Sequence, residues 1–330
     1  MDDIITLDYG SGGKKTAALI DEIIIPELGN NTLNSLGDGA ILDGKLAFST
    51  DSFVVSPLFF PGGDIGKLCV CGTVNDLAMC GAEPRYLSLA LVIEEGFPTE
   101  NLRRIVASIK AAAETAGVAV VTGDTKVVER GRGDGVYITT SGIGVVRYPG
   151  LGPERMSEGD AVLISGTAGD HGAAVMLARD GLMEGEIRSD CAALNGLARA
   201  VLESGADVKV LRDPTRGGVA TTLCEFAESA DLGIELDEAA IPVRRDVSAA
   251  CGLLGLDPLY CANEGKMLAV VAAEDAERAL RAMRGVREGE NAAIIGRVIS
   301  DRPGKVVLRT AMGGGRILQK LAGAQLPRIC

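Results

Sequence analysis

The sequence predicts a two-domain fold of the α/β (α+β) class that ends in a flexible tail. Its 330 residues are enough for two domains, each with its own core. Strand-like and helix-like patterns alternate in both halves, and a run rich in Pro and Gly at 148–153 interrupts this alternation. We therefore expect an N-terminal domain over 1–150, a second α/β domain over 151–312 and a tail over 313–330.

The first half should alternate helices and strands. Apolar residues at helical spacing predict a helix that begins at Lys14 and stops near Pro26 to Gly29. Two further helices are predicted over 65–80, a run rich in small residues, and over 99–116, with Thr99 as its N-cap. The expected strands cover 45–55, with Asp51 in the middle, and then 85–93, 118–121 and 136–146.

The second half repeats this pattern. Helices are expected over 171–179 and 191–202, and the loop 212–218 should open a third. The expected strands cover 161–165, 233–236, 267–272, 292–298 and 305–310. The glycines Gly313-Gly-Gly315 then release the tail, because a glycine run is flexible.

Composition and charge exclude several classes of function. The chain carries 33 Lys and Arg against 45 Asp and Glu, a formal net charge of −12. An acidic chain without a basic block is a poor binder of nucleic acid or of anionic membranes, and 3% aromatic residues offer few platforms for stacked bases. Residues 1–8 lack the apolar region of a signal peptide, and the longest apolar runs are the length of strands. We therefore expect a cytoplasmic protein.

The cysteines do not form a metal-binding pattern. The eight cysteines include no CxxC pair, and His171 is the only histidine, so a zinc site is poorly supported. Cys330 differs from the others because it is the last residue, beyond a glycine tether. That arrangement is typical of a carrier thiol, although an incidental Cys at a frayed end is the alternative. We expect the α-carboxylate to raise the pKa of this thiol and Arg328 to oppose the rise.

Two loops could bind phosphate. The backbone N–H groups of Gly10-Ser-Gly-Gly-Lys14, followed by a helix, suit a phosphate. The loop does not fit the Walker A pattern, and an ordinary flexible loop explains it equally well. The loop Asp213-Pro-Thr-Arg-Gly-Gly218 offers Arg216 and a helix N-terminus, or is simply a turn. His171 is expected to cap a helix or to fill a loop rather than to catalyse.

Four aspartates of the first half form a possible cation site. Each is flanked by small or hydroxyl residues; they are Asp38, Asp51, Asp76 and Asp124. A turn or cap role explains any one of them. As a set beside strands of one half, they would repel one another unless cations neutralised them. Oxygen ligands around nucleotide phosphates are the usual arrangement for Mg²⁺, so these aspartates form a magnesium site if they converge.

Lys126 and Glu264 could serve an elimination driven by ATP. A lysine stabilises developing negative charge, and a carboxylate can take a proton. A pair of ordinary surface residues is the alternative.

Eight short segments are distributed in order along almost the whole chain, and we interpret them as one set. They are Gly10-Ser-Gly-Gly-Lys14, Phe48-Ser-Thr-Asp-Ser52, Phe59-Phe-Pro-Gly-Gly63, Gly123-Asp-Thr-Lys-Val127, Gly169-Asp-His-Gly172, Asp213-Pro-Thr-Arg-Gly-Gly218, Ala262-Asn-Glu-Gly-Lys266 and Pro327-Arg-Ile-Cys330. As a set they resemble the HypE family of hydrogenase maturation factors, which are carbamoyl dehydratases. The terminal tetrapeptide joined to the other seven segments makes this resemblance specific.

The resemblance implies a fold, a reaction and partners. The implied fold is that of aminoimidazole-ribonucleotide synthetase, in a homodimer that binds Mg-ATP mainly through the N-terminal domain near the dimer interface. Cys330 would receive a carbamoyl group from the carbamoyltransferase HypF, and ATP would dehydrate the thiocarbamate to a thiocyanate. The cyanide would then pass to iron on the HypC–HypD complex for [NiFe]-hydrogenase.

The resemblance also implies roles for individual residues. Cys330, Lys126 and Glu264 would be the catalytic residues, with Lys126 and Glu264 acting at the tail thiol. The residues expected to hold Mg-ATP are Asp38, Asp51, Asp76 and Asp124, together with Gly12, Gly13, Lys14 and Thr122 at the nucleotide.

Two rival interpretations remain open at this point. One is another ATP-dependent synthetase of the same fold. Selenophosphate synthetase usually carries Cys or Sec in its glycine loop, which here reads Ser11-Gly-Gly13, and the purine enzyme needs no terminal Cys. The other is a nucleotide-gated scaffold that only docks maturation partners.

Overall fold

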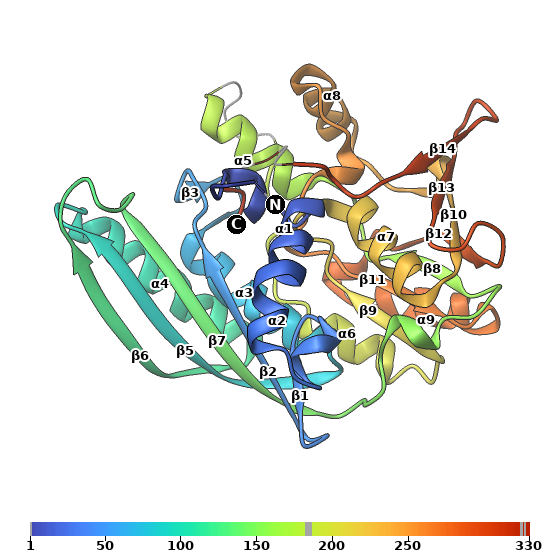
Figure 1. Ribbon diagram of the computed structural model, residues 1–330, viewed down its shortest axis with the longest axis horizontal. Coiled ribbons are helices and arrows are strands. Elements are labelled where there is room, and N and C mark those ends of the chain that lie inside the picture. Colours follow the sequence, from blue (N-terminus) through green and yellow to red (C-terminus); the bar gives the residue numbers. More distant parts are fainter. Residues whose placement is uncertain (1, 182–186, 324–325, 327) are drawn as a thin grey trace.

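Two β-sheets organise the chain, one from each half (Figure 1). The structure is a computed structural model and describes residues 2–181, 187–323, 326 and 328–330. A short hairpin of β3 (Phe59–Phe60) and β4 (Gly63–Asp64) lies apart from the two sheets. Among the described helices, we find none that combines the length and the apolar character needed to cross a membrane.

Within the described part of the chain, the helices that pack on the first sheet cover one of its faces. Its strands, in spatial order, are β1 (Ala40–Leu42), β2 (Leu46–Phe53), β7 (Val136–Val146), β5 (Ala82–Glu94) and β6 (Ala119–Val128). β5 and β6 are parallel and the other pairs are antiparallel. The covering helices are α3 (Ile65–Met79) and α4 (Thr99–Ala116).

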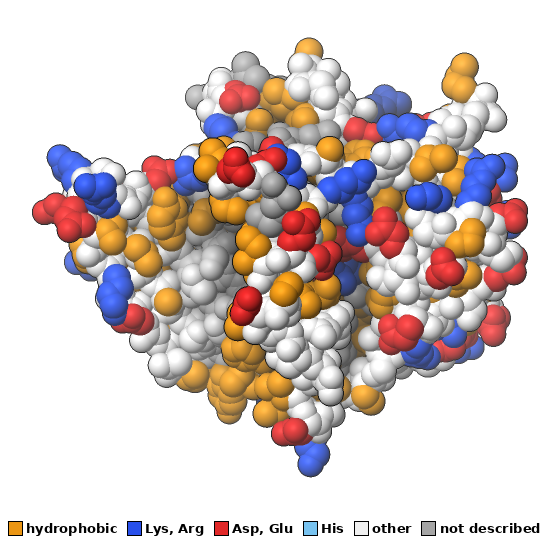
Figure 2. Space-filling model, viewed as in Figure 1, with side chains coloured by type: hydrophobic (Ala, Val, Ile, Leu, Met, Phe, Trp, Pro, Cys, Tyr) orange, Lys and Arg blue, Asp and Glu red, His pale blue; other side chains and the backbone are white. Residues whose placement is uncertain are grey.

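Strand β2 shows how the sequence distinguishes the two faces. Ala47, Ser49 and Phe53 are buried toward α3, whereas the alternate residues Phe48 and Ser52 are exposed, as the two-residue period of a strand requires. The second face of the sheet therefore stays open, and Figure 2 shows hydrophobic side chains over its strands.

The second sheet is buried on both faces. Its strands, in spatial order, are β14 (Gly315–Leu318), β13 (Val306–Arg309), β10 (Gly233–Asp237), β12 (Ala293–Ile299), β8 (Ala161–Ile164), β11 (Leu268–Val271) and β9 (Val208–Arg212). Val162 and Ile164 pack in one apolar cluster with α7 (Gly218–Ala230). Ala161 and Leu163 pack in another cluster with α6 (Asn195–Leu202) and α9 (Ala276–Arg284). Burial on both faces explains the continuously apolar sequence of β8 and β11.

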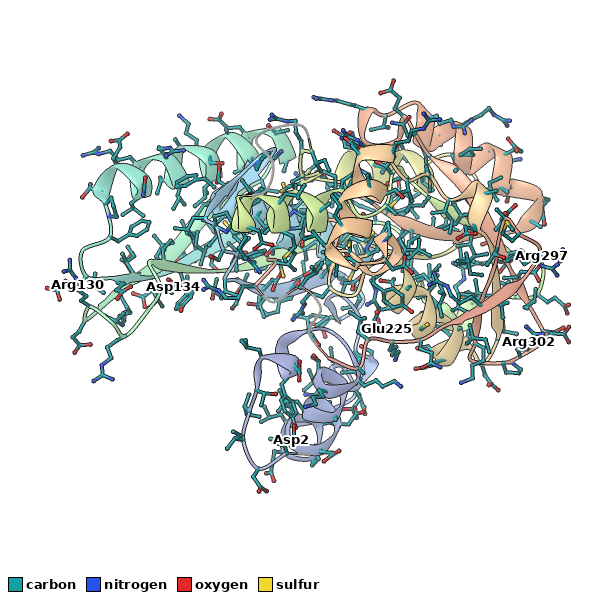
Figure 3. All side chains as sticks on the ribbon, turned by 90° about the horizontal axis from the view of Figure 1, so that it is seen from above. Asp2, Arg130, Asp134, Glu225, Arg297 and Arg302 are labelled. Atoms are coloured by element: carbon teal, nitrogen blue, oxygen red, sulfur yellow. The ribbon has the colours of Figure 1, made fainter. Side chains whose placement is uncertain are left out.

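Two further helical regions complete the described chain. α5 (Asp170–Asp180) packs against α8 (Arg245–Leu254). The N-terminal helix consists of α1 (Lys14–Leu19), a π-helical stretch over Ile20–Ile24 and α2 (Ile25–Leu28). No residue of these three stretches is buried, and the N-terminal segment projects from the body, with Asp2 near its tip (Figure 3).

Most of the predicted elements are confirmed, with five differences. The helix predicted over 191–202 begins only at Asn195, as α6. Thr99 is the first residue of α4 rather than its N-cap, because Pro98 holds the cap position without a side-chain bond. β6 runs to Val128, well beyond the short strand predicted. The prediction missed several elements, namely β1, β3, β4, β9, β14, α8 and α9. The glycines at 313–315 form a turn into β14, which pairs with β13, so the tail does not begin there as a free segment.

Candidate active site at the C-terminal cysteine

The last residues of the chain lie along the continuation of β2. The Val54 N–H donates to the Cys330 main-chain oxygen at 2.9 Å, and the Ser56 N–H donates to the Arg328 carbonyl at 3.2 Å. Ile329 is 4% exposed and packs in the core of the first domain. The end of the chain is therefore folded into the molecule, which differs from the expected free tail. Pro327 of the terminal motif lies outside the described residues.

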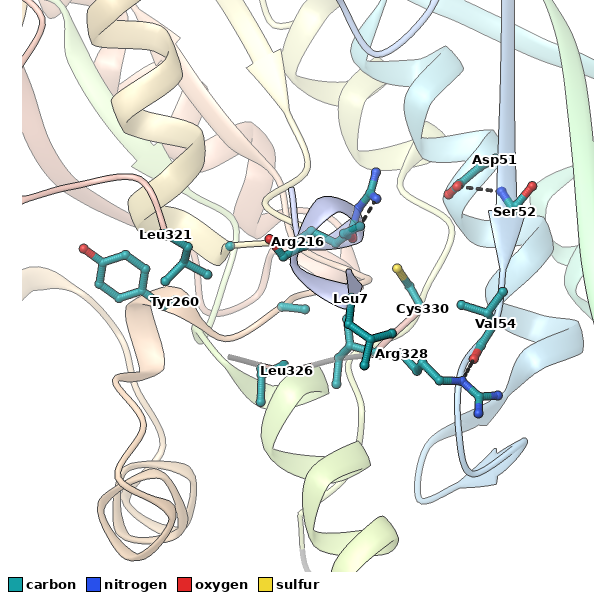
Figure 4. A pocket seen from close by; sticks show the side chains of 15 residues that line it. Leu7, Asp51, Ser52, Val54, Arg216, Tyr260, Leu321, Leu326, Arg328 and Cys330 are labelled. Atoms are coloured by element: carbon teal, nitrogen blue, oxygen red, sulfur yellow. Dashed lines mark hydrogen bonds between the residues drawn. The ribbon is translucent and has the colours of Figure 1, made fainter. Parts of the chain in front are cut away.

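The Cys330 side chain lies at a cavity of about 160 Å³ between the two domains (Figure 4). Its walls come from the N-terminal loop at Gly10 and Ser11, from Asp51 on β2, from Arg216 before α7, and from the tail itself. The chain thus brings four segments that are distant in sequence around one sulfur atom.

The charges around Cys330 differ from those predicted. Burial raises the pKa of the Cys330 thiol, the carboxylates of Glu264 and Asp51 raise it further, and Arg216 lowers it. The expectation that Arg328 opposes the rise is wrong. The Arg328 guanidinium turns away, donates to the Val54 carbonyl at 2.9 Å and forms an ion pair with Asp134.

Glu264 is a buried carboxylate whose charge reaches this thiol. It is 2% exposed, and Oε1 has no hydrogen-bond partner in the described part of the chain. Burial raises the pKa of Glu264 well above its ordinary value, and the carboxylates of Asp213 and Asp51 add to the rise. Asn263 fixes the loop, because its side chain accepts from the Gly169 N–H at 2.8 Å and donates to the Pro214 carbonyl at 3.1 Å. A fixed carboxyl group with a raised pKa suits proton transfer.

Three aspartates converge near the cavity. Asp38, Asp76 and Asp213 each place a carboxylate oxygen within 4.8 Å of the others. Arg212 binds Asp38 at 2.9 Å, and Ser49 donates to Asp76 at 2.6 Å. Burial raises the pKa of Asp38 to about 6 and that of Asp213 to about 8. Asp51 is close enough for its charge to raise the pKa of Asp76 and Asp213.

The donor set fits a hard cation. All the ligand atoms are carboxylate oxygens, which Mg²⁺ prefers, and the buried Asp213 Oδ2 has no hydrogen-bond partner within the ranges described. The prediction included Asp38, Asp51 and Asp76 but not Asp213. The sequence analysis did select the loop that contains Asp213, but it considered only Arg216 of that loop, as a phosphate-binding residue.

Asp124 does not join these aspartates within one chain. It lies on β6, three strands away from β2 in the order β2-β7-β5-β6, or about 14 Å at the usual strand spacing. Through successive pairs, Asp124 is level with Ala90, Thr139 and Ser52, so it faces the open side of the sheet, whereas Asp51 faces the helices. The expected four-aspartate site is therefore not assembled by a single chain.

Thr122 and Lys126 lie on the same edge strand. Lys126 is exposed, and its Nζ donates to Asp124 at 2.7 Å. In the strand register, Lys126 lies opposite the position of Val54, the residue after β2 that binds the tail. Three strand spacings separate the two residues. One chain therefore does not bring Lys126 to Cys330.

The glycine loop is shaped by contacts with other parts of the protein. A Cβ atom at Gly12 would lie 2.8 Å from Arg216 Cβ, and one at Gly13 would lie 2.3 Å from the Leu321 carbonyl oxygen. The Lys14 N–H donates to that same carbonyl at 2.9 Å. These close approaches explain why both positions require glycine, with no need for a bound phosphate. The role of Gly12, Gly13 and Lys14 in nucleotide binding stays a prediction.

Comparison with known proteins agrees with the fold. Residues 36–146 match the N-terminal domain, and residues 157–309 the C-terminal domain, of AIR synthase related proteins. Carbamoyl dehydratase HypE of Azotobacter vinelandii is 52% identical over 99% of this chain and 97% of its own length. The chain belongs to the HypE family of carbamoyl dehydratases.

Two solved HypE structures extend the comparison. HypE in complex with ATP is 50% identical, with a TM-score of 0.84, over 99% of this chain and 100% of that chain. A HypE–HypF complex contains a chain that is 48% identical, with a TM-score of 0.88, over 92% of this chain and 100% of that one. These HypE relatives match the chain across both domains, so the fold implied by the resemblance is confirmed.

Proposed function

We propose that this protein dehydrates a carbamoyl group on its own Cys330 to a thiocyanate, with ATP as the driving substrate. The observation that carries the proposal is a chain of buried, electrostatically coupled groups: the charge of Glu264 raises the pKa of the Cys330 thiol, and Asp213 of the Asp38–Asp76–Asp213 cluster raises the pKa of Glu264. The HypE relatives crystallised with ATP and with HypF support ATP as the nucleotide and HypF as a partner, and the role of HypF as carbamoyl donor stays a prediction. The HypC–HypD complex as cyanide acceptor and the cytoplasmic location stay predictions.

Each residue has a defined part in this reaction. Mg-ATP, when bound, supplies the γ-phosphoryl group that turns the carbamoyl oxygen into a phosphate leaving group. One N–H proton leaves the carbamoyl group when its oxygen is phosphorylated, and Glu264 takes the second as the C–O bond to phosphate breaks and the C≡N bond forms on the sulfur. Asp38, Asp76 and Asp213 would hold Mg²⁺, and Lys126 would stabilise charge on the transferring phosphoryl group. Closing the cavity around the sulfur keeps water from the activated carbamoyl group.

We further propose that the active form is a homodimer in which a second chain supplies Asp124 and Lys126. Both residues lie on the open face of the first sheet, which also carries a row of paired apolar side chains. Phe48, Ile143 and Tyr86 in that row are 39%, 42% and 52% exposed. The N-terminal segment adds further exposed apolar side chains at Ile5 and Leu7. Adjacent apolar surfaces of this kind are typical of association between subunits.

The mass of the intact protein tests the reaction. After incubation with HypF, carbamoyl phosphate and Mg-ATP, the wild-type protein should gain one carbamoyl group and then lose one water molecule. Cys330→Ala should fold and bind ATP but show neither change. A Cys330→Ala protein that still gains protein-bound cyanide would exclude the proposal, and ATP hydrolysis without any mass change would favour the nucleotide-gated scaffold.

The aspartate cluster predicts how stability depends on pH. Burial raises the pKa of Asp213 to about 8, so the folded protein binds this proton more tightly than the unfolded chain does. The stability that this proton contributes is complete below the ordinary value of 3.8 and is lost as the pH rises through about 8. The melting temperature of the nucleotide-free protein should therefore fall between about pH 6 and pH 8.

The variant Asp213→Asn tests both the loss of stability at high pH and the proposed magnesium site. It should raise the melting temperature at pH 8 by roughly 2–4 °C per kcal/mol of relieved repulsion. Mg²⁺ should stabilise the wild-type protein but not this variant, as measured by thermal unfolding. The exposed Asp237→Asn serves as the control and should respond to Mg²⁺ as the wild type does. Equal stabilisation of both variants by Mg²⁺ would contradict the proposed site.

A further inference from the structure

We propose that His171 is a positioning residue that holds the end of the chain at the depth where the Cys330 sulfur can react, and that Arg179 assists it. This inference rests on the proposed function, because it names the residues that control the tail at that same site. Neither residue belongs to the catalytic set derived above, and both lie on α5, which packs beside the tail.

The hydrogen bonds of His171 fix its protonation. The ring is fully buried at the start of α5, and Nε2 lies 2.8 Å from the Ile329 carbonyl oxygen. Because a carbonyl oxygen only accepts, Nε2 must carry the hydrogen. Nδ1 lies 2.8 Å from Ser189 Oγ, which itself accepts from the Cys191 N–H at 3.0 Å. Burial lowers the pKa of His171 and so favours the neutral ring, in which Nδ1 accepts from the Ser189 hydroxyl and the Nε2–H is aimed at the tail.

This bond acts next to the reactive sulfur. Ile329 directly precedes Cys330, and the oxygens of these two consecutive residues are held by different domains. His171 of the second domain binds the first oxygen, and Val54, at the end of the strand that carries Asp51, binds the second. The sulfur is thus placed relative to both Asp51 and Glu264, although neither residue contacts the tail main chain in any bond described above.

Arg179 fastens the tail one residue further back. Its Nη2 donates to the Arg328 carbonyl at 2.8 Å and to the Ser56 carbonyl at 2.7 Å, and its Nε donates to Ser56 at 2.9 Å. One guanidinium therefore ties the tail to the continuation of β2. His171 and Arg179 lie eight residues apart on α5, so a single helix holds two successive carbonyls of the tail.

All these contacts use main-chain oxygens of the tail and not the sulfur. They are therefore available whether Cys330 is free, carbamoylated or dehydrated. Weakening them should release the sulfur from the cavity and slow dehydration, while the sulfur, once outside, remains able to receive its carbamoyl group.

Alkylation of Cys330 tests the positioning without requiring any enzymatic activity. N-ethylmaleimide should label Cys330 in His171→Ala and Arg179→Ala about tenfold faster than in the wild type, which corresponds to about 1.4 kcal/mol and is within the range for one buried hydrogen bond. Peptide mass spectrometry separates Cys330 from the other cysteines. His171→Gln should stay near the wild-type rate, because its amide N–H can replace the Nε2 donor. Arg278→Ala, which removes an arginine bonded to the Gly205 carbonyl on another part of the surface, is the matched control.

A single-turnover measurement on carbamoylated protein provides the functional readout. Dehydration should slow about tenfold in His171→Ala and Arg179→Ala, with carbamoyl loading by HypF unchanged and His171→Gln close to the wild type. The inference is overturned if both alanine variants leave Cys330 as protected as in the wild type. If the wild-type protein itself never loses water, the proposed function fails instead, and the labelling rates still decide whether His171 positions the tail.

Discussion

Replacing Glu264 by glutamine should stop the reaction at the carbamoyl stage, with dehydration slowed by about 10²–10⁴-fold, the usual contribution of a general base. Glutamine keeps the size of the side chain but takes no proton. Because Glu264 is fully buried among other carboxylates, removing its charge relieves repulsion, so the variant should fold and bind ATP as the wild type does. Intact mass spectrometry should show the carbamoylated protein accumulating without loss of water.

The pH dependence separates this role from a structural one. Burial raises the pKa of Glu264, so part of the wild-type protein carries a protonated and inactive carboxyl group at low pH. The wild-type rate should rise with pH until that proton is lost, and the residual rate of Glu264→Gln should lack this dependence. Glu235→Gln, which removes a surface carboxylate paired with Arg297 and Arg309, is the control and should dehydrate normally. Normal dehydration by Glu264→Gln would remove Glu264 from the mechanism.

The fold was predictable where the local pattern decides the structure. β7 occupies the residues predicted, 136–146, because its alternating and apolar residues leave no competing interpretation. The missed helix α9 buries Ala279, Leu280 and Met283, yet charged residues at most other positions masked its apolar stripe. α8 contains Gly252 and a short apolar face, and its burial depends on contact with α5, which no local pattern shows. The formation of α8 and α9 therefore depends on tertiary contacts and not on the local sequence pattern.

The site was predictable only in part, because convergence in space is not a local property. Asp38 and Asp76 meet as expected, but their third partner, Asp213, comes from the other domain. The charge of Glu264 raises the pKa of Cys330 although 65 residues separate the two in sequence. That neighbourhood followed from the resemblance to a family and not from spacing. His171 was expected to cap a helix or fill a loop, since nothing in its own segment indicates the carbonyl it binds near the end of the chain.

Mixed dimers should recover activity that neither parent variant has. Lys126→Ala and Glu264→Gln are each expected to be inactive as homodimers. If a site combines Glu264 and Cys330 of one chain with Lys126 of its partner, then a mixed dimer contains one intact site. In a one-to-one mixture, half of the dimers should be mixed, so total dehydration should return to about a quarter of the wild-type value. If Lys126 instead acts in the site of its own chain, every site in the mixture would remain defective.

The identity of the chain that carries the product shows which residues act across the interface. Glu264 acts electrostatically on Cys330 of its own chain, so only the Lys126→Ala chain should bear the dehydrated group, and intact mass distinguishes the two chains. Lys126 is exposed and bonded to Asp124 of the same strand, so the alanine variant should fold and dimerise normally. Product on the Glu264→Gln chain would mean that Glu264 acts across the interface. No recovery in verified mixed dimers would show that Lys126 has no part in the partner's site, and the open face of the first sheet would then lose its proposed catalytic role.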